Sequence, residues 1–558
     1  MPHRCLGILD ITQIICEDLF EEDYLASLSS LAATCSYISD TALDVLWKEQ
    51  NSLVPLLRTL PENLLTVAGN GDSEVYIDEL DDQTLTLVNK IPATAWTRIQ
   101  SYARRVRCLR LGEATGGTIV RSSSPHDPLA RKVLAIDISV LDELLARTGG
   151  HPLFPRLQYL YFRDIEETLV HLVLPLSRLP PLTDVEVYMS AHDGSTDYAA
   201  FLERLLPVCP DLQTLSLTGD NTPPVEPELL KAISDAACAC RSLKSAHLLD
   251  IDPRALAHLA RTRSLSSLKI GLNSRLEKAL HQRADVDIRW DDDIVLSDLV
   301  VEPELCGQLE TLLNALHGNR LKVELFHMTC YEECDCSPGR SGCDPRVRNL
   351  ELLAKAFDPA YMNEFAYVQS CDIPLGRGSV PASHVLQLAT GYPKLTWLIV
   401  DCWVALADDD LTDIARALPQ LELLMLDTRC PRPELSRTTR RVRTSLAALK
   451  SFAHYCPDIR YLSFWVNAAR IPSTSRTSPL KANARQSVRL HFAESKFTDD
   501  YGVAGYLRHV FPAGCDIMLE PPEYEGLDDD YDPPEGYSDG THKWIAVKEA
   551  LRVLEKYT

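Results

Sequence analysis

The sequence predicts an α/β fold, with a helical unit at the N-terminus followed by a solenoid of strand–helix repeats that forms a curved parallel sheet. A short phrase, a helix end that often carries a proline and then Leu-x-x-Leu-x-Leu, recurs from about residue 106 onward. Between the copies lie amphipathic stretches at helical spacing, such as residues 198–206 and 411–418. One strand cannot bury both of its faces alone, so we expect the repeats to stack around a continuous apolar core.

The spacing of the phrase is irregular but bounded. Its first apolar position falls in clear copies at Leu157, Leu212, Leu395, Leu421 and Ile459, and in weaker copies at Val106, Leu182, Leu243 and Leu265. Most steps between neighbouring copies lie between 22 and 31 residues, with one of 38, which scatters around the period of leucine-rich repeats. We predict full burial in short parallel strands for Leu215, Leu217, Leu398, Leu424, Leu462 and Phe464. A generic α/β domain with leucine-rich strands stays open as an alternative, because the pattern is weak between residues 275 and 390.

The first fifty residues predict two or three short helices. Apolar residues recur at helical spacing at positions 11, 14, 15 and 19, and again at 25, 28, 31, 35 and 38. Asp10 and Asp23 can accept hydrogen bonds from the free amides of the first turns. The apolar surface of these helices is large for a unit too small to bury it alone. The unit therefore either packs on the rest of the chain or offers this surface to a partner.

At these residues the stretch resembles an F-box. Asp10-Ile11 stands for the acidic-isoleucine pair of that motif, and its two helices are supplied by Ile14, Ile15, Leu19, Leu25, Leu28 and Leu31. Ala33-Thr34-Cys35 stands for the valine-cysteine step, and Leu46-Trp47 closes the motif. Leu9 stands where the family usually has proline. A segment before the first repeat is similar to fungal F-box proteins at Pro92, Trp96, Tyr102, Ala103, Arg105 and Val106.

The resemblance to a fungal, basidiomycete-type F-box protein with degenerate leucine-rich repeats implies a substrate-recognition subunit of a Skp–cullin–F-box ubiquitin ligase. The implied partners are a Skp-type adaptor, a cullin reached through it, and an unknown protein substrate on the repeats. The residues that the resemblance places at the adaptor are Leu9, Ile11, Ile14, Ile15, Leu19, Leu28, Leu31, Cys35 and Trp47. A scaffold whose F-box-like helices no longer bind the adaptor stays open, because of Leu9, as does an ordinary helical cap on a larger domain.

The expected organisation has five parts. F-box-like helices occupy residues 1–60, a helical linker 61–105, and the leucine-rich-repeat-like solenoid 106–519. Residues 520–540 are acidic and rich in Pro, Gly and Tyr, so they predict a disordered tether. Residues 541–558 predict a helix that caps the last repeat with one apolar face, formed by Trp544, Val547, Leu551 and Leu554.

Charge and cysteine content narrow the function classes. The net charge of −23 argues against general affinity for nucleic acid or an anionic membrane, because both need a basic surface. No apolar run has the length of a membrane span, and the N-terminus lacks the features of a secretory signal. Most of the 17 cysteines stand singly in apolar stretches, which is typical of reduced, buried residues. We expect a cytoplasmic or nuclear protein.

Motifs for chemistry are few. There is no phosphate-binding loop, dinucleotide fingerprint, His-Glu-x-x-His or nucleophile elbow, so we expect no enzyme, no catalytic residues and no cofactor. The best metal candidates lack a second C-x-x-C pair, and we interpret them as incidental thiols in a loop: His327, Cys330, Cys334, Cys336 and Cys343. A basic patch of Arg437, Arg440, Arg441 and Arg443 precedes an expected helix start near Thr444. It is either a partner site for an acidic peptide or phosphate, or a solvated loop.

Overall fold

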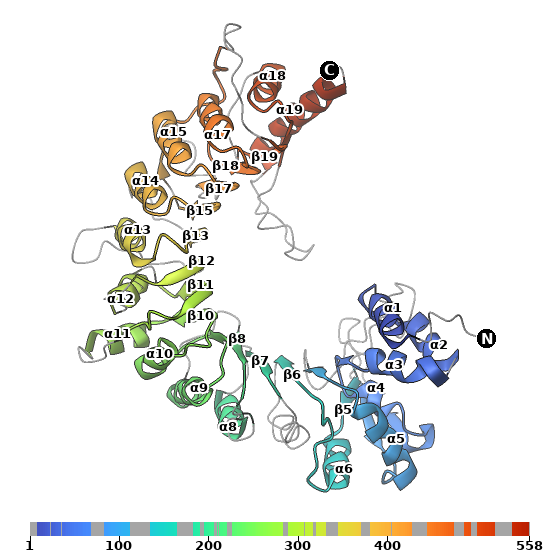
Figure 1. Ribbon diagram of the computed structural model, residues 1–558. Coiled ribbons are helices and arrows are strands. Elements are labelled where there is room, and N and C mark those ends of the chain that lie inside the picture. The colour runs from blue at the N-terminus through green and yellow to red at the C-terminus, as the bar shows by residue number, and fades with distance from the viewer. Residues whose placement is uncertain are drawn as a thin grey trace, which may run out of the picture. The chain divides into compact units, whose positions relative to one another are not determined.

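The fold is that of a computed structural model (Figure 1), which describes residues 8–22, 24–34, 36–68, 83–111, 134–163, 182–189, 195–205, 209, 211–219, 226–282, 288–305, 307–315, 320–330, 344–369, 380–402, 404–426, 443–473, 485–492, 499–518 and 538–556. The chain divides into two compact units, Met1–Ser264 and Leu265–Thr558. Strands of both belong to one 15-stranded sheet, in the order β1-β4-β6-β7-β8-β9-β10-β11-β12-β13-β15-β17-β18-β19-β20. This strand order, with described helices between most successive strands, confirms the predicted α/β repeat fold with a large parallel sheet.

The first unit begins with three helices, α1 (Leu9–Glu21), α2 (Leu25–Thr34) and α3 (Ser36–Leu46). Asp10 does not cap α1 as expected. The N-cap is Ile8, which has no side-chain acceptor, and Asp10 lies inside the first turn, where its charge suits the helix dipole. Asp23 lies outside the described residues.

The sheet of the first unit starts directly after α3. Its strands are β1 (Glu49–Gln50), β4 (Cys108–Leu111), β6 (Tyr159–Arg163), β7 (Asp184–Met189), β8 (Thr214–Gly219) and β9 (Ser245–Leu248), and neighbours pair in parallel. The helices between these strands are α4 (Val54–Leu57), α5 (Ala93–Ala103), α6 (Ile138–Thr148), α8 (Ser195–Leu205) and α9 (Pro227–Ala239), and α10 (Pro253–Leu259) follows β9.

The segment 61–105 is not only a helical linker. Besides the turn η2 (Glu62–Leu64) and α5, it contains β2 (Leu65–Ala68) and β3 (Gln83–Leu87), which pair antiparallel. β3 also pairs in parallel with β5 (Leu134–Ile136), so a separate three-stranded sheet forms. The alternation Thr84-Leu85-Thr86-Leu87 explains the strand, because alternate side chains point to opposite faces and Leu85 is buried.

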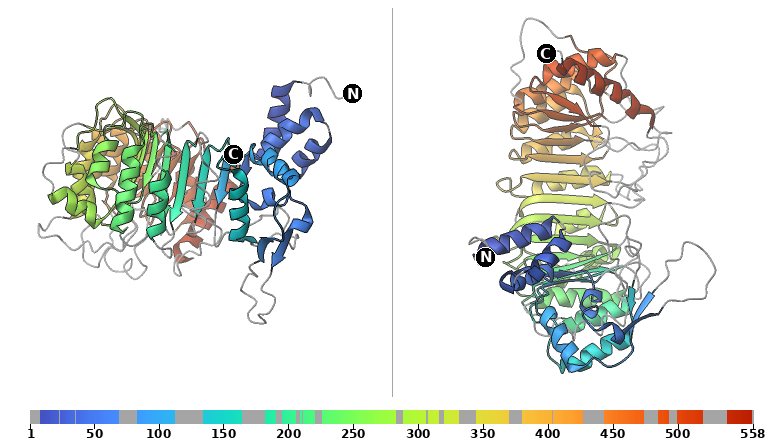
Figure 2. Two further views of the ribbon diagram at one scale, coloured as in Figure 1. Left: turned by 90° about the horizontal axis from the view of Figure 1, so that it is seen from below. Right: turned by 90° about the vertical axis from the view of Figure 1, so that its right-hand side faces the viewer.

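The second unit continues the repeat through the region where the sequence pattern is weak. Its strands are β10 (Ser267–Leu272), β11 (Val295–Pro303), β12 (Lys322–Cys330), β13 (Glu364–Gln369), β15 (Trp397–Asp401), β17 (Leu423–Leu426), β18 (Tyr461–Ser463), β19 (Val488–His491) and β20 (Cys515–Ile517). Neighbouring strands are parallel, and Figure 2 shows them stacked one after another. A separate parallel pair is formed by β14 (Val380–Pro381) and β16 (Val404–Ala405), which precede and follow β15 in the sequence.

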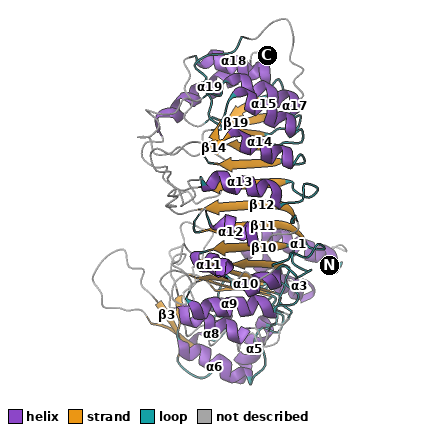
Figure 3. Ribbon diagram, turned by 90° about the vertical axis from the view of Figure 1, so that its left-hand side faces the viewer, coloured by secondary structure: helices purple, strands orange, loops and turns teal. Residues whose placement is uncertain are grey.

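The helices of the second unit are α11 (Ser274–Gln282), α12 (Gln308–Ala315), α13 (Pro345–Ala356), α14 (Ala382–Gly391), α15 (Asp408–Ala417), the turn η3 (Leu446–Ala448), α17 (Leu449–Tyr455), α18 (Asp500–Val510) and α19 (Ser538–Lys556). Helices α11 to α17 lie on one side of the strands of this unit, and α19 packs against the last strand. Figure 3 shows α12 to α15 lying across the strands, and in Figure 1 the strands of this unit follow the inner side of an arc of helices. The core is therefore the layer between one sheet face and the helices.

The phrase positions occupy that core. Leu215, Leu217, Leu398, Leu424 and Leu462 are all buried in strands of the sheet, as predicted. Phe464 is buried as well, but it lies one residue beyond the end of β18.

The C-terminal helix α19 contacts both α18 and β20. Trp544, Val547 and Leu551 are buried, and the ring of Trp544 lies 4.9 Å from that of Phe492. Lys548 Nζ donates to the carbonyl oxygen of Ile517 at 2.9 Å. The helix begins at Ser538, earlier than expected, and the rest of the expected tether, residues 520–537, lies outside the described residues.

Candidate partner-docking site

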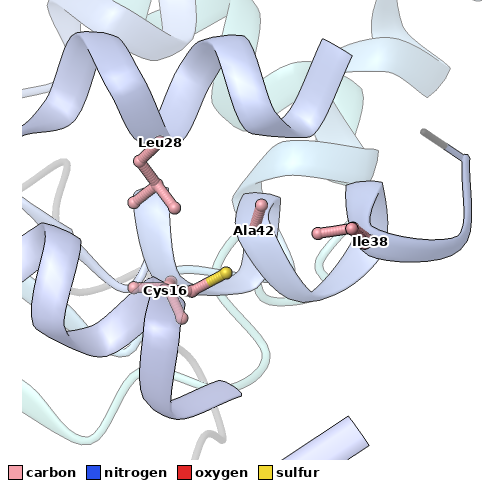
Figure 4. Packing of buried hydrophobic residues seen from close by; sticks show 5 residues of the cluster. Cys16, Leu28, Ile38 and Ala42 are labelled. Carbon is pink, nitrogen blue, oxygen red and sulfur yellow. The ribbon is translucent and has the colours of Figure 1, made fainter. Parts of the chain in front are cut away.

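The three N-terminal helices close a small core of their own. Cys16, Leu28, Ile38, Ala42 and Val45 form it and are all buried; Figure 4 labels four of them between the helices. Burial raises the pKa of the Cys16 thiol, and the charge of Glu17 adds to this. The thiol therefore stays protonated and acts as a small apolar side chain.

Several apolar side chains of α1 remain outside this core. Leu9 is 62% exposed, Ile14 is 56% exposed and Ile15 is 36% exposed, while Ile11 is half-buried. With 3.6 residues per turn, the side chains of Ile11, Ile14 and Ile15 fall within about 100° around the helix axis. We call these three residues the isoleucine face. Large exposed apolar side chains gathered on one helix face are typical of a protein-interaction surface.

Exposed apolar side chains also occur on the next two helices. Leu25 is exposed on α2, Tyr37 is exposed on α3, and Tyr24 is exposed immediately before α2. Because α1, α2 and α3 pack on each other, all of these side chains belong to the same small unit. The unit buries its five core residues and leaves several large apolar side chains exposed.

The residues assigned to the adaptor by sequence fall into two groups. Leu9, Ile11, Ile14 and Ile15 reach the surface. Others hold the unit together, because Leu28 is fully buried in the core and both Leu19 and Leu31 pack against it. Trp47 is half-buried and stacks on Tyr102 of α5, with ring centroids 4.6 Å apart. Cys35 lies outside the described residues.

Arg105 lies two residues after the end of α5 and joins this part of the chain to α3 of the helical unit. Its guanidinium donates to the Asp40 carboxylate at 2.6 Å, to the Asp40 carbonyl at 3.0 Å and also to the Asp44 carboxylate. Burial opposes its charge, but the hydrogen bond with Asp40 and the charge of Asp44 outweigh this, so the pKa of Arg105 is raised. Sequence reasoning matched Arg105 to a family segment but did not pair it with α3.

The basic patch is only partly described. Arg443 is exposed and its backbone forms a bridge with Ala407, while Arg437, Arg440 and Arg441 lie outside the described residues. The helix expected near Thr444 begins as η3. Its N-cap, Ser445, is held by Asp408, whose two carboxylate oxygens accept from Ser445 N and Oγ at 2.6 Å each.

The metal candidates do not assemble in the described part of the chain. Cys330 is buried, and the His327 ring lies 2.7 Å from the Thr329 hydroxyl, while Cys334, Cys336 and Cys343 lie outside the described residues. Burial lowers the pKa of His327. Within the described ranges, no group of three or more His, Cys, Asp or Glu side chains could hold a metal ion.

No protein-family model matches the chain, and no curated protein sequence is significantly similar to it. A solved structure similar to this chain is the crystal structure of the Rad7 and Elc1 complex in yeast. The match has a TM-score of 0.35 at 12% identity and covers 59% of this chain and 73% of that chain.

The arrangement is suited to binding. The described helices include none that is long and apolar enough to cross a lipid bilayer. What the N-terminal unit offers is an apolar helix face on a unit that the Arg105–Asp40 contact and the Trp47–Tyr102 stack join to the region of α5. Such a face can bury apolar surface against a partner.

Proposed function

We propose that this protein is the substrate-recognition subunit of a Skp–cullin–F-box ubiquitin ligase in the cytoplasm or nucleus. In this proposal the isoleucine face binds a Skp-type adaptor, which connects the chain to a cullin, and the repeat sheet binds a protein substrate. The observation that carries the proposal is the exposure of Ile14 and Ile15 on a helix whose own unit already has a closed core. The sequence resemblance to an F-box supports the same assignment.

The proposed mechanism is proximity. A receptor that holds a substrate next to a charged ubiquitin enzyme raises the effective concentration of the acceptor lysine, so it needs no catalytic residue of its own. A scaffold of stacked repeats suits this role because each repeat adds binding surface without changing the others. The net charge of −23 fits a protein partner better than a nucleic acid.

The decisive experiment is co-purification of the full chain with a Skp-type adaptor. Ile15→Asp places a charge on the isoleucine face, where a buried apolar anchor typically contributes on the order of 2 kcal/mol to binding. We expect this variant to lose the adaptor while its circular dichroism spectrum and melting temperature stay unchanged. The matched control is Val553→Asp, which puts the same charge on a 41% exposed position of α19 and should leave adaptor binding intact.

The alternative function is a repeat scaffold whose helical unit no longer binds the adaptor. It is favoured by Leu9, which stands where the resembled family has proline. Failure of the unmodified chain to bind any Skp-type adaptor would support the scaffold. Adaptor binding that survives Ile15→Asp would show that the isoleucine face is not the contact.

A further inference from the structure

The sheet face of the second unit that points away from the helices carries an apolar strip. Its side chains alternate with the buried residues Phe326, Phe365, Leu398 and Leu424, so they project from the opposite face. The parallel register places Leu325, Glu364, Trp397 and Leu423 side by side on β12, β13, β15 and β17. A second row, one step further along the strands, places Ala366 beside Ile399. We call the apolar members, Leu325, Ala366, Trp397, Ile399 and Leu423, the Trp397 strip.

The Trp397 strip is open to solvent. Trp397 is 41% exposed, and the other four members are half-buried. Neighbouring strands of a sheet lie about 4.8 Å apart, so Trp397 and Leu423 are direct neighbours, as are Ala366 and Ile399, whereas Glu364 stands between Leu325 and Trp397. An exposed tryptophan at the centre of an apolar surface is typical of a binding anchor.

Glu364 interrupts this strip with a charge. It pairs in register with Leu325 on one side and Trp397 on the other, and it is half-buried. The nearby Glu422 forms an ion pair with Arg460, with Nε 3.3 Å from Oε2, but Glu364 has no basic partner among the described residues. Burial raises the pKa of the Glu364 carboxyl, and the negative charge of Glu422 raises it further. A cation brought by a partner would relieve both effects.

We propose that the Trp397 strip and Glu364 bind an extended protein segment that carries a lysine or arginine next to apolar residues. The apolar side chains of the segment lie on Leu325, Ile399 and Leu423, and its cation lies between the Trp397 ring and the Glu364 carboxylate. Cation–π contact and a charge-assisted hydrogen bond both favour that position. The net charge of −23 attracts such a segment from a distance. A nucleic acid is disfavoured, because its phosphates would meet Glu364 and Glu422.

This inference deepens the proposed receptor function, since it names the class of segment that the repeats take. Only one part of it rests on the proposed function, namely that the bound segment belongs to a protein to be ubiquitinated. The binding itself uses β12 to β17, whereas the adaptor contact uses α1. The two can therefore fail separately.

The test uses a phage-displayed library of random linear peptides, selected against the immobilised full-length chain. Enriched sequences should combine a lysine or arginine with neighbouring apolar or aromatic residues. A labelled peptide from the selection then gives dissociation constants by fluorescence anisotropy. Trp397→Ala should weaken its binding at least about tenfold, the loss typical of an interface anchor. Tyr501→Ala is the matched control, since Tyr501 is 60% exposed on α18, and it should change nothing.

Charge variants test the role of Glu364. Glu364→Gln keeps the shape of the side chain and should weaken binding of the basic peptide. It should not weaken binding of a peptide whose basic residue is replaced by glutamine. Glu364→Lys should reverse the charge preference, so that the variant binds a peptide whose basic residue is replaced by glutamate more tightly than the original peptide. The control Glu549→Gln removes one exposed carboxylate from α19 and should have no effect.

The outcomes are distinct. Selected peptides without a basic residue, binding that is insensitive to Trp397→Ala, or the absence of any selected peptide would each overturn the inference. Loss of adaptor binding with peptide binding intact would overturn the receptor function alone. Unchanged melting temperatures of the Trp397 and Glu364 variants would show that any loss of binding is local.

Discussion

At the scale of single residues, Arg105 joins parts of the chain that are distant in sequence. Its partners Asp40 and Asp44 lie 65 and 61 residues away. Arg105 itself is buried, whereas Asp40 is largely exposed and Asp44 partly so. The guanidinium therefore depends on these carboxylates more than they depend on it.

Replacing Arg105 should loosen the N-terminal unit. Arg105→Met keeps the length of the side chain but removes its charge-assisted hydrogen bonds. We expect the free energy of unfolding to fall by about 1–3 kcal/mol, measured by urea denaturation. The adjacent Arg104 is exposed, so Arg104→Met is the matched control and should be nearly neutral. Equal effects of the two substitutions would rule out a special role for the Arg105 ion pairs.

His491 gives a prediction for pH. It is buried in β19 with Nδ1 2.8 Å from the Ser463 hydroxyl, and burial lowers its pKa from 6.5 to about 4. Between those values the unfolded chain binds more protons at this residue, so stability is full above pH 6.5 and is lost as the pH falls towards 4. The loss attributable to His491 should reach up to about 3 kcal/mol.

The measurement is the free energy of unfolding at several pH values. His491→Gln should have a shallower decline between pH 6.5 and 4.5 than the parent chain, while the exposed control His151→Gln should keep the parent slope. Parallel curves for His491→Gln and the parent would show that the buried imidazole does not control this dependence.

These residue-level features could be only partly predicted from sequence. The exposed Ile14 and Ile15 follow from helical spacing, because a two- or three-helix unit cannot bury every apolar face. The Arg105–Asp40 pair and the burial of His491 could not be predicted, because both depend on contacts between segments far apart in the chain. Trp47 could be matched to the end of the motif. Its stacking on Tyr102 could not be predicted, because it depends on where α5 lies.

At the scale of elements, the repeat was predicted on both sides of residues 275–390, where copies of the phrase follow one another. It was missed at β11, β12 and β13. The register of their neighbours aligns Leu268 with Leu299, Phe326, Phe365 and Leu398 in turn. The first phrase positions are then Leu296, Val323 and Met362, all fully buried. At β12 and β13, phenylalanine, valine and methionine occupy core positions that leucine fills elsewhere, so a search for leucine passed over these two strands. β11 carries Leu296 and Leu299 at both positions, but its neighbours lack the phrase.

The small sheet of β2, β3 and β5 left a clearer signal. Thr84 to Leu87 alternates polar and apolar residues with a period of two, which is typical of a half-buried strand. The helical pattern of residues 93–105 dominated the interpretation of the whole linker. The strand period of two residues in β3 differs from the helix period of 3.6 residues in α5, so the two elements are distinguishable in the sequence.

The C-terminal helix supplies a prediction at this scale. Trp544 is buried against Phe492, so Trp544→Ala leaves a cavity between α19 and the last strands. We expect a loss of about 3–5 kcal/mol in the free energy of unfolding. Val553→Ala, at a 41% exposed position of the same helix, should change it by no more than about 0.5 kcal/mol. A similar small effect for both would mean that α19 is not docked in solution.

At the scale of the whole molecule, stacked repeats should respond locally to damage, because each repeat contacts mainly its neighbours. Phe326 is buried against Phe357 and Phe365, at 4.8 and 5.4 Å between ring centroids. Phe326→Ala should therefore speed amide hydrogen exchange in β11, β12 and β13 and leave α1 to α3 unchanged. The measurement is hydrogen exchange followed by mass spectrometry of peptic fragments.

A matched substitution in the first unit completes this test. Phe162 is buried against Phe201 at 5.3 Å, so Phe162→Ala should speed exchange in β6 and its neighbours but not in β12. Faster exchange throughout both units after either substitution would indicate that the chain unfolds as one cooperative block, contrary to the expectation for a repeat array.

The strand lengths along the sheet have a consequence for self-association. The interior strands β11 and β12 have nine residues each, whereas the terminal strands β1 and β20 have two and three. A sheet grows by templating a new strand on an edge, and so short an edge presents few free amides and carbonyls. At β20 the outward carbonyl of Ile517 is already taken by Lys548. A second copy of the chain would thus find little to pair with at either terminus, and an array of many parallel strands can stay a monomer rather than polymerise.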